Sequence, residues 1–163
     1  MFRLALAAVC LLTLAAPLSA RESLGVFDDW GAFRDPSVPR CYAITAAQAD
    51  KAAGAYAAYA DVGTWPRQGV RVQVHVRTSR QMAKGGHVSL SLGGRRYDLS
   101  GGGADAWAQD KRMDAAIVAA MRSADAMTLN ATDTAGHRFA DRYSLKGAPT
   151  AMDAATVGCA RLR

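Results

Sequence analysis

The clearest pattern in the sequence is a strict alternation of valine with polar residues over residues 70–77. Valine occupies the even positions, and Arg71, Gln73, His75 and Arg77 occupy the odd ones. A period of two places neighbouring side chains on opposite faces of a strand. This segment is therefore predicted to be a strand with one buried face and one face in water.

Two hairpins are predicted by the same alternation. In the first, the segment 88–92 turns at Gly93-Gly94 into 95–99, where Tyr97 and Leu99 point inward. In the second, the segment 127–132 turns at residues 134–136 into a return strand over 139–145. The sequence places Phe139, Asp141, Tyr143 and Leu145 on one face of that return strand.

Helical spacing appears between the hairpins and again at the end of the chain. After Gly101-Gly102-Gly103, with Asp105 as the expected N-cap, apolar residues recur at the spacing of a helix, which predicts an amphipathic helix over about 106–123. Pro149 suits the first turn of a short C-terminal helix over about 150–158. The glycine run before the first helix also resembles an anion-binding loop, but it matches no phosphate-binding fingerprint.

The front of the chain adds weaker strand signals over 26–33 and 41–45, while residues 46–63 fit either a loop or a strand. Strands outnumber helices and follow one another through tight turns, which favours antiparallel pairing. We therefore predict a mainly β or α+β fold, an antiparallel sheet or sandwich with one amphipathic helix and a short C-terminal helix.

The first twenty residues have the pattern of a secretory signal peptide. A basic start ending at Arg3 precedes an apolar run from Leu4 to Leu14, and small residues follow at Ser19-Ala20. The run is shorter than the roughly 20 residues that a transmembrane helix needs. We expect cleavage before Arg21, a single domain over 21–163 without a transmembrane span, and a periplasmic or secreted location.

The cysteine count fits that location. Cys10 lies in the apolar run and leaves with the signal peptide, so Cys41 and Cys159 remain. Two cysteines in an oxidising compartment predict a structural disulfide, here one that closes a loop of about 118 residues. A redox site is disfavoured because the chain has no Cys-x-x-Cys pair.

The net positive charge of the chain indicates which class of partner to expect. The chain has 20 Lys and Arg against 14 Asp and Glu, a net charge of +6 that falls to +5 with the loss of Arg3. A basic cytosolic protein would suggest nucleic acid, but an exported one without a nucleic-acid motif meets anionic lipids, polymers and proteins of the envelope.

Arginines recur at polar positions of the predicted strands or beside them, and neighbouring strands could merge them into one basic face that holds phosphates, acidic polymers or an acidic partner. The alternative is an ordinary solvated sheet surface. The candidate residues are Arg71, Arg77, Arg95, Arg96, Arg138 and Arg142.

No catalytic or metal-binding constellation is visible. The spacing of His75, His87 and His137 matches no compact ligand pattern, and no nucleophile elbow occurs, so no metal, cofactor or catalytic residue is assigned. The alternative is a periplasmic enzyme with an unrecognised site, which a histidine in a pocket beside Asp98 or Asp141 would favour. The tryptophans and tyrosines could form an aromatic binding surface, but large aromatics in a small domain are more often core.

Several short motifs resemble the invasion-associated locus B family. They are the segment from Phe27 to Phe33 (FDDWGAF), Cys41-Tyr42-Ala43-Ile44, and Tyr143 to Gly147 (YSLKG) followed by the alanine-rich residues 150–155. In the family a Trp is closely followed by one Cys and then by a second. Here Trp30 and Cys41 are eleven residues apart and the other Cys is C-terminal, which suggests a divergent branch.

This resemblance implies an exported protein of Gram-negative bacteria, chiefly alphaproteobacteria, without recognised enzymatic activity. Some members are implicated in host-cell invasion, but no catalytic residues carry over. Together with the basic face, it suggests a non-enzymatic envelope protein that binds another envelope component.

Overall fold

The computed structural model describes residues 21–48 and 55–160, which form two antiparallel sheets and two α-helices. The predicted signal peptide, residues 1–20, lies outside the described residues. The elements in chain order are β1 (Glu22–Phe27), β2 (Trp30–Asp35), β3 (Arg40–Ala46), β4 (Tyr59–Trp65), a 3₁₀ turn (Pro66–Gln68), β5 (Val70–Arg77), β6 (Ser89–Leu92), β7 (Arg95–Asp98), β8 (Ser100–Gly102), β9 (Asp105–Trp107), α1 (Lys111–Met121), β10 (Ala126–Thr132), β11 (Arg138–Ser144) and α2 (Ala148–Cys159).

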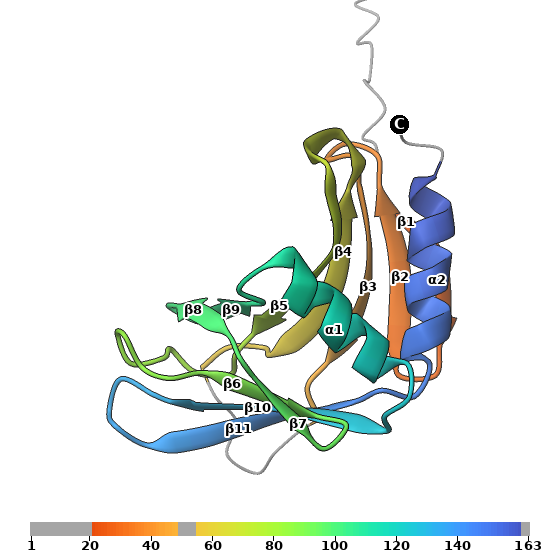
Figure 1. The fold of residues 1–163 in the computed structure, drawn as a ribbon. Coiled ribbons are helices and arrows are strands. Elements are labelled where there is room, and N and C mark those ends of the chain that lie inside the picture. The colour runs from red at the N-terminus through yellow and green to blue at the C-terminus, as the bar shows by residue number, and fades with distance from the viewer. Residues whose placement is uncertain (1–20, 49–54, 161–163) are drawn as a thin grey trace, which may run out of the picture.

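The two sheets have different sizes and lie at a large angle to one another (Figure 1). The seven-stranded sheet has the order β1-β2-β3-β4-β5-β9-β8, and the four-stranded sheet has the order β11-β10-β6-β7. All strand pairs are antiparallel, as expected for strands joined by tight turns. The prediction of a mainly β or α+β fold with two helices is confirmed.

The strands with the cleanest alternation are confirmed. The valine segment is β5, with Val74 and Val76 buried and His75 and Arg77 on the other face. The two predicted hairpins are β6–β7 and β10–β11, which pair with each other through β10 and β6. Asp141, Tyr143 and Leu145 are buried, in line with their predicted common face.

Three boundaries differ from the prediction. The segment 26–33 is two strands, because the chain turns at Asp28-Asp29 and Asp28 has a positive φ of 49°. The first helix begins at Lys111, and its N-cap is Asp110, whose carboxylate accepts from the N–H of Met113 at 2.8 Å. Asp105, the expected cap, is instead the first residue of β9, because residues 100–107 pair as strands β8 and β9.

Both helices cover one face of the large sheet. α2 packs on β1 to β4, and α1 packs on β5 and β6. The row Ala32, Ala43, Val62 and Val74, which are direct cross-strand neighbours, points toward this side and is at most 5% exposed. The disulfide between Cys41 on β3 and Cys159 at the end of α2, with Cα atoms 5.6 Å apart, joins the helix to the same face. We refer to the opposite face of the seven-stranded sheet as the outer face.

A single carboxylate fixes α1 to β5. β9 pairs with β5 only at residues 75–77, so β9 supplies no acceptor for the N–H of Val74. Asp114 of α1 supplies one, since its Oδ1 accepts from that N–H at 2.7 Å. Burial raises the pKa of Asp114, against the opposing effect of this hydrogen bond. No helix within residues 21–48 and 55–160 is long and apolar enough to cross a membrane.

Candidate functional site

The six candidate arginines do not form one continuous face. Three of them share the outward face of the four-stranded sheet, and the other three lie elsewhere. Arg96 is on β7, and Arg138 and Arg142 are on β11. We call these three exposed residues the arginine face.

The register of the strands places two of these arginines in one row. Arg96 pairs with Ser91, Ser91 with Thr128, and Thr128 with Arg142. The residues on either side, such as Leu90, are buried, so the row points outward. Three strand spacings of about 4.8 Å put the Cα atoms of Arg96 and Arg142 about 14 Å apart.

Arg138 extends the arginine face along the edge strand. It lies four residues before Arg142 on β11, and a rise of about 3.4 Å per residue separates the two Cα atoms by about 14 Å. A hollow of about 500 Å³ opens between this edge and β7. It is lined by His87, Ser89, Arg96, Asn130, Ala131, Thr132, Arg138, Phe139 and Ala140. The arginines therefore surround a floor of hydroxyl and amide groups.

The arginine face has unbalanced positive charge. Among the described residues, none of its three arginines takes part in an ion pair. The nearest acidic group in register is Asp98, which lies two residues from Arg96 and whose carboxylate is 2.9 Å from Nε2 of His87. Three unpaired guanidinium groups around hydrogen-bonding side chains can hold a ligand that carries several anions.

The other three candidate arginines lie outside the arginine face. Arg95 lies opposite the buried Leu92, with its guanidinium 5.8 Å from the Tyr97 ring, so it points away from the arginine face. Arg71 lines a cavity of about 650 Å³ beside Cys159, together with Arg67, Thr64 and Thr156. Arg77 lies on the outer face of the large sheet.

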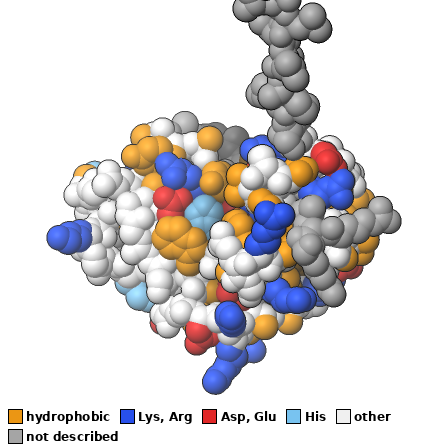
Figure 2. Space-filling view, turned by 90° about the horizontal axis from the view of Figure 1, so that it is seen from above, with side chains coloured by type: hydrophobic (Ala, Val, Ile, Leu, Met, Phe, Trp, Pro, Cys, Tyr) orange, Lys and Arg blue, Asp and Glu red, His pale blue; other side chains and the backbone are white. Residues whose placement is uncertain are grey.

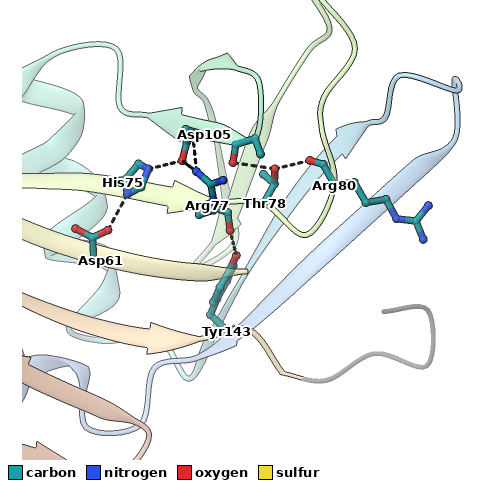
Figure 3. Close-up of polar contacts among 8 residues, drawn as sticks. Asp61, His75, Arg77, Thr78, Arg80, Asp105 and Tyr143 are labelled. Carbon is teal, nitrogen blue, oxygen red and sulfur yellow. Dashed lines mark hydrogen bonds and ion pairs between the residues drawn. The ribbon is translucent and has the colours of Figure 1, made fainter. Parts of the chain in front are cut away.

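Arg77 belongs to a charged cluster around His75 (Figure 3). Nδ1 of His75 lies 2.7 Å from Oδ2 of Asp61 on β4, and Nε2 lies 3.0 Å from Oδ1 of Asp105 on β9. Arg77 donates to the same Asp105 carboxylate at 3.0 Å. Trp107 stacks on the imidazole with ring centres 5.2 Å apart, and the Tyr59 ring meets it edge-on.

The charge state of His75 follows from these neighbours. Burial by itself lowers the pKa of His75, but the hydrogen bonds and charges of Asp61 and Asp105 outweigh it, so the pKa is raised. With a carboxylate at each ring nitrogen, the imidazolium form donates at both positions. The two carboxylates therefore favour the protonated form of His75.

A hydrogen-bond network next to this cluster joins the two sheets. The hydroxyl of Tyr143 on β11 donates to the backbone carbonyl of Arg77 at 3.4 Å. Thr78 donates to the carbonyls of Arg80 and Ala104, and Arg80 pairs with Asp133 at 3.1 Å. Burial raises the pKa of Tyr143, so its hydroxyl stays neutral. These contacts are structural, because the Tyr143 and Arg80 contacts join segments of the two sheets.

The contacts of His87 and His75 bear on the alternative that the protein is an enzyme. His87 lines the hollow of the arginine face and contacts Asp98, the kind of pair that an enzyme would use, but both side chains are more than 60% exposed. His75 is beside aspartates too, yet both of its nitrogens are already bonded. Within the described segments, no group of three or more His, Cys, Asp or Glu side chains could hold a metal ion.

Sequence reasoning missed two features of these sites. It did not select Ser91, Thr128 and Asn130, which lie between the arginines, although their alternation with buried residues of β6 and β10 marks them as outward-facing. It also did not select Asp61, because residues 46–63 gave no clear strand signal. The alternation in β7 shows which of its two arginines points outward. Tyr97 points inward, so Arg95, two residues before it, is on the inward side and Arg96 is on the outward side.

Comparison with known proteins gives a family. A model of the family described as "Invasion associated locus B (IalB) protein" matches residues 33–156, which is most of the chain and includes the arginine face and the His75 cluster. No match is found among curated proteins or among solved structures.

Proposed function

The chain belongs to the invasion associated locus B family, and from this premise we propose that it is an exported, non-enzymatic envelope protein that binds an anionic envelope component through the arginine face. The family is not a known enzyme family. The pattern of residues 1–20 and the disulfide between Cys41 and Cys159 both support export to an oxidising compartment.

The observation that carries the binding proposal is the cross-strand row Arg96, Ser91, Thr128 and Arg142. A solvated sheet surface normally mixes charges of both signs, whereas this row has a free arginine at each edge and hydroxyl groups between them. Arg138 adds a third positive charge beside the hollow. The face is built on paired strands, so the Cα atoms of its arginines are held at fixed spacing.

The spacing of the three arginines indicates the class of ligand that the arginine face can bind. The three arginines have Cα atoms about 14 Å apart and can contact several anionic groups at once, so the face suits a ligand that presents several anions on a larger scaffold. The hydroxyl and amide groups of Ser91, Thr128 and Asn130 suit a hydroxyl-rich scaffold. Phosphorylated glycolipids and acidic polysaccharides share this chemistry of anions carried on sugars.

A binding experiment with two arms tests the proposal. The purified protein is mixed with vesicles that contain lipid A, with vesicles of phosphatidylcholine alone, and separately with soluble polygalacturonate. We expect binding in one or both anionic arms, no binding to phosphatidylcholine, and a steep loss of binding as salt screens the charges. The arm that binds identifies a lipid-borne or a polymeric ligand.

The two adjacent arginines of β7 provide a matched control. Arg96→Ser and Arg95→Ser remove the same charge from neighbouring positions, but only Arg96 lies on the arginine face. We expect Arg96→Ser to weaken binding and Arg95→Ser to have little effect. Adding Arg138→Ser to Arg96→Ser should bring the loss to about tenfold or more, which is about 1.4 kcal/mol. Equal losses from both positions would show a diffuse charge effect and contradict the site.

The alternative, a periplasmic enzyme, is favoured only by the His87–Asp98 pair at the hollow. The same samples test it, because the bound glycolipid or polymer can be analysed for cleavage. Product formation that is lost in His87→Gln would assign an enzyme in place of a binding protein.

A further inference from the structure

The outer face of the seven-stranded sheet has an unusual composition for a sheet surface. A sheet covered on one side normally carries polar residues on the other. Here the helices lie on the inner face, yet several large apolar side chains point outward from four strands of the sheet. They are Phe33 on β2, Tyr42 and Ile44 on β3, Tyr59 and Trp65 on β4, and Trp107 on β9.

The strand register shows that these residues share the face of His75. Phe33 pairs with Tyr42 and Tyr42 with Gly63 in one row across β2, β3 and β4. In the next row, Asp61 pairs with His75 and His75 with Trp107 across β4, β5 and β9. The aromatic rings therefore follow a stripe from β2 to β9, which spans four strand spacings, or about 19 Å.

Two rings of this stripe lie flat on the sheet because glycines leave room for them. A Cβ atom on Gly63 would be 2.6 Å from the Trp65 ring, and one on Gly31 would be 2.8 Å from the Phe33 ring. The Trp107 ring is also nearly parallel to the imidazole of His75 on which it stacks, with an angle of 28° between the two planes. Flat rings on a rigid sheet present a π face to solvent, and Trp107 is 37% exposed.

The polar groups between the rings form ion pairs that leave little net charge. Arg40 pairs with Asp35, Arg77 with Asp105, and His75 with Asp61. The Tyr42 ring is 5% exposed and lies beneath the Arg40 guanidinium, which is 4.7 Å from the ring centre.

We infer that this aromatic stripe is a binding site for an uncharged glycan chain, whose sugar rings stack on Trp107, Trp65 and Phe33. The positive C–H edges of a sugar ring suit the negative face of an aromatic ring. The balanced ion pairs give no preference for a charged ligand, in contrast to the arginine face. A length of about 19 Å accommodates several sugar residues. The inference is independent of the proposed function, because it uses another sheet and another chemistry.

Figure 2 shows that hydrophobic, acidic and basic side chains lie side by side around a histidine at the surface of the molecule. This mixture matches the composition of the stripe at His75, where Trp107, Asp105 and Arg77 are in contact with or next to the imidazole. A flat, mixed surface of this kind suits an extended chain better than a compact small molecule, which is normally held in a concave pocket.

The test uses chitohexaose as a soluble, uncharged probe, and insoluble chitin and cellulose for pull-down. We expect a saturable change in tryptophan fluorescence and retention on at least one polymer, both unaffected by salt. Trp107→Ala is expected to weaken binding about tenfold or more, whereas Trp107→Phe keeps a ring and retains most of it. Because Trp107 is partly exposed, its replacement leaves the fold intact, which an unchanged thermal midpoint verifies.

Arg96→Ser with Arg138→Ser is the matched control, since it changes the arginine face alone. Unchanged glycan binding in this variant together with loss in Trp107→Ala supports the inference whether or not the arginine face binds anions. Failure of all three probes, or equal binding by Trp107→Ala, overturns it. Self-association that disappears in Trp107→Ala, without glycan binding, would assign the stripe to a protein interface and would also overturn it.

Discussion

Nδ1 of His75 lies 2.7 Å from a carboxylate oxygen of Asp61, across the pairing of β4 and β5. This contact is much less exposed than the His87–Asp98 pair, because both of its side chains are at most 15% exposed. Asp105 approaches the opposite nitrogen, and Trp107 covers the ring. His75 therefore links three strands of the large sheet, and its protonated form makes both contacts as ion pairs.

The raised pKa of His75 predicts how stability depends on pH. A group whose pKa is higher in the folded protein contributes stability that is fully present below its unfolded value, about 6.5, and is lost as pH rises through the folded value. We expect the free energy of unfolding to fall as pH rises above about 6.5. Urea unfolding at a series of pH values measures this free energy, and an NMR titration of the His75 ring follows its protonation.

His75→Gln isolates this effect. The amide can still bond to one aspartate but has no charge to lose, so the decline in stability above about pH 6.5 should flatten. The variant should also be less stable than the parent at low pH, where the parent has its full ionic contacts. An unchanged pH profile in His75→Gln would show that another group causes the decline.

A second prediction concerns the hydrogen bond from Val74 to Asp114. Asp114→Ala removes the acceptor and leaves a buried N–H without a partner, which should destabilise the protein by about 1–3 kcal/mol. Asp114→Asn keeps an acceptor oxygen of the same shape and should cost clearly less. Urea unfolding of both variants measures the difference. Equal losses would show that the carboxylate charge, not the acceptor, is what α1 requires.

The disulfide gives a third prediction. Reduction, or the pair Cys41→Ser and Cys159→Ser, should lower the free energy of unfolding by about 2–5 kcal/mol, because the bridge closes a long loop and ties α2 to β3. The native, unreduced protein should show no reactive thiol from these two cysteines. Two labelled thiols without reductant would refute the bridge.

Much of the fold could be predicted from the sequence because its strongest signals are local. The alternation in residues 70–77 and the turns at Gly93-Gly94 and Gly136 need only neighbouring residues to specify a strand or a hairpin. The split of 26–33 into β1 and β2 was missed, because it depends on Asp28 adopting a left-handed conformation rather than on the hydrophobic pattern.

The sites were harder to predict because they depend on which face of a sheet is covered. Alternation assigns Arg77 and His75 to one face, but only the packing of α1 and α2 shows which face the two helices leave uncovered. Pairing between distant strands brings Asp61 and Asp105 to His75, and pairing of β10 with β6 brings Arg142 into line with Arg96. The expectation that large aromatics form the core fits Trp30, which is fully buried, but not the partly exposed Trp107.

The last prediction uses glycine to test whether the flat aromatic rings matter. Gly63→Ala would place a methyl group 2.6 Å from the Trp65 ring, so the indole must leave its position on the sheet. We expect a lower thermal midpoint, a shifted tryptophan emission and weaker glycan retention. Gly102→Ala is the control, since its Cβ would meet no atom within 4 Å and its strand, β8, lies at the edge of the same sheet. If Gly63→Ala binds chitohexaose as well as Gly102→Ala does, the flat Trp65 ring is not part of the site, and the glycan must stack on Trp107 without it.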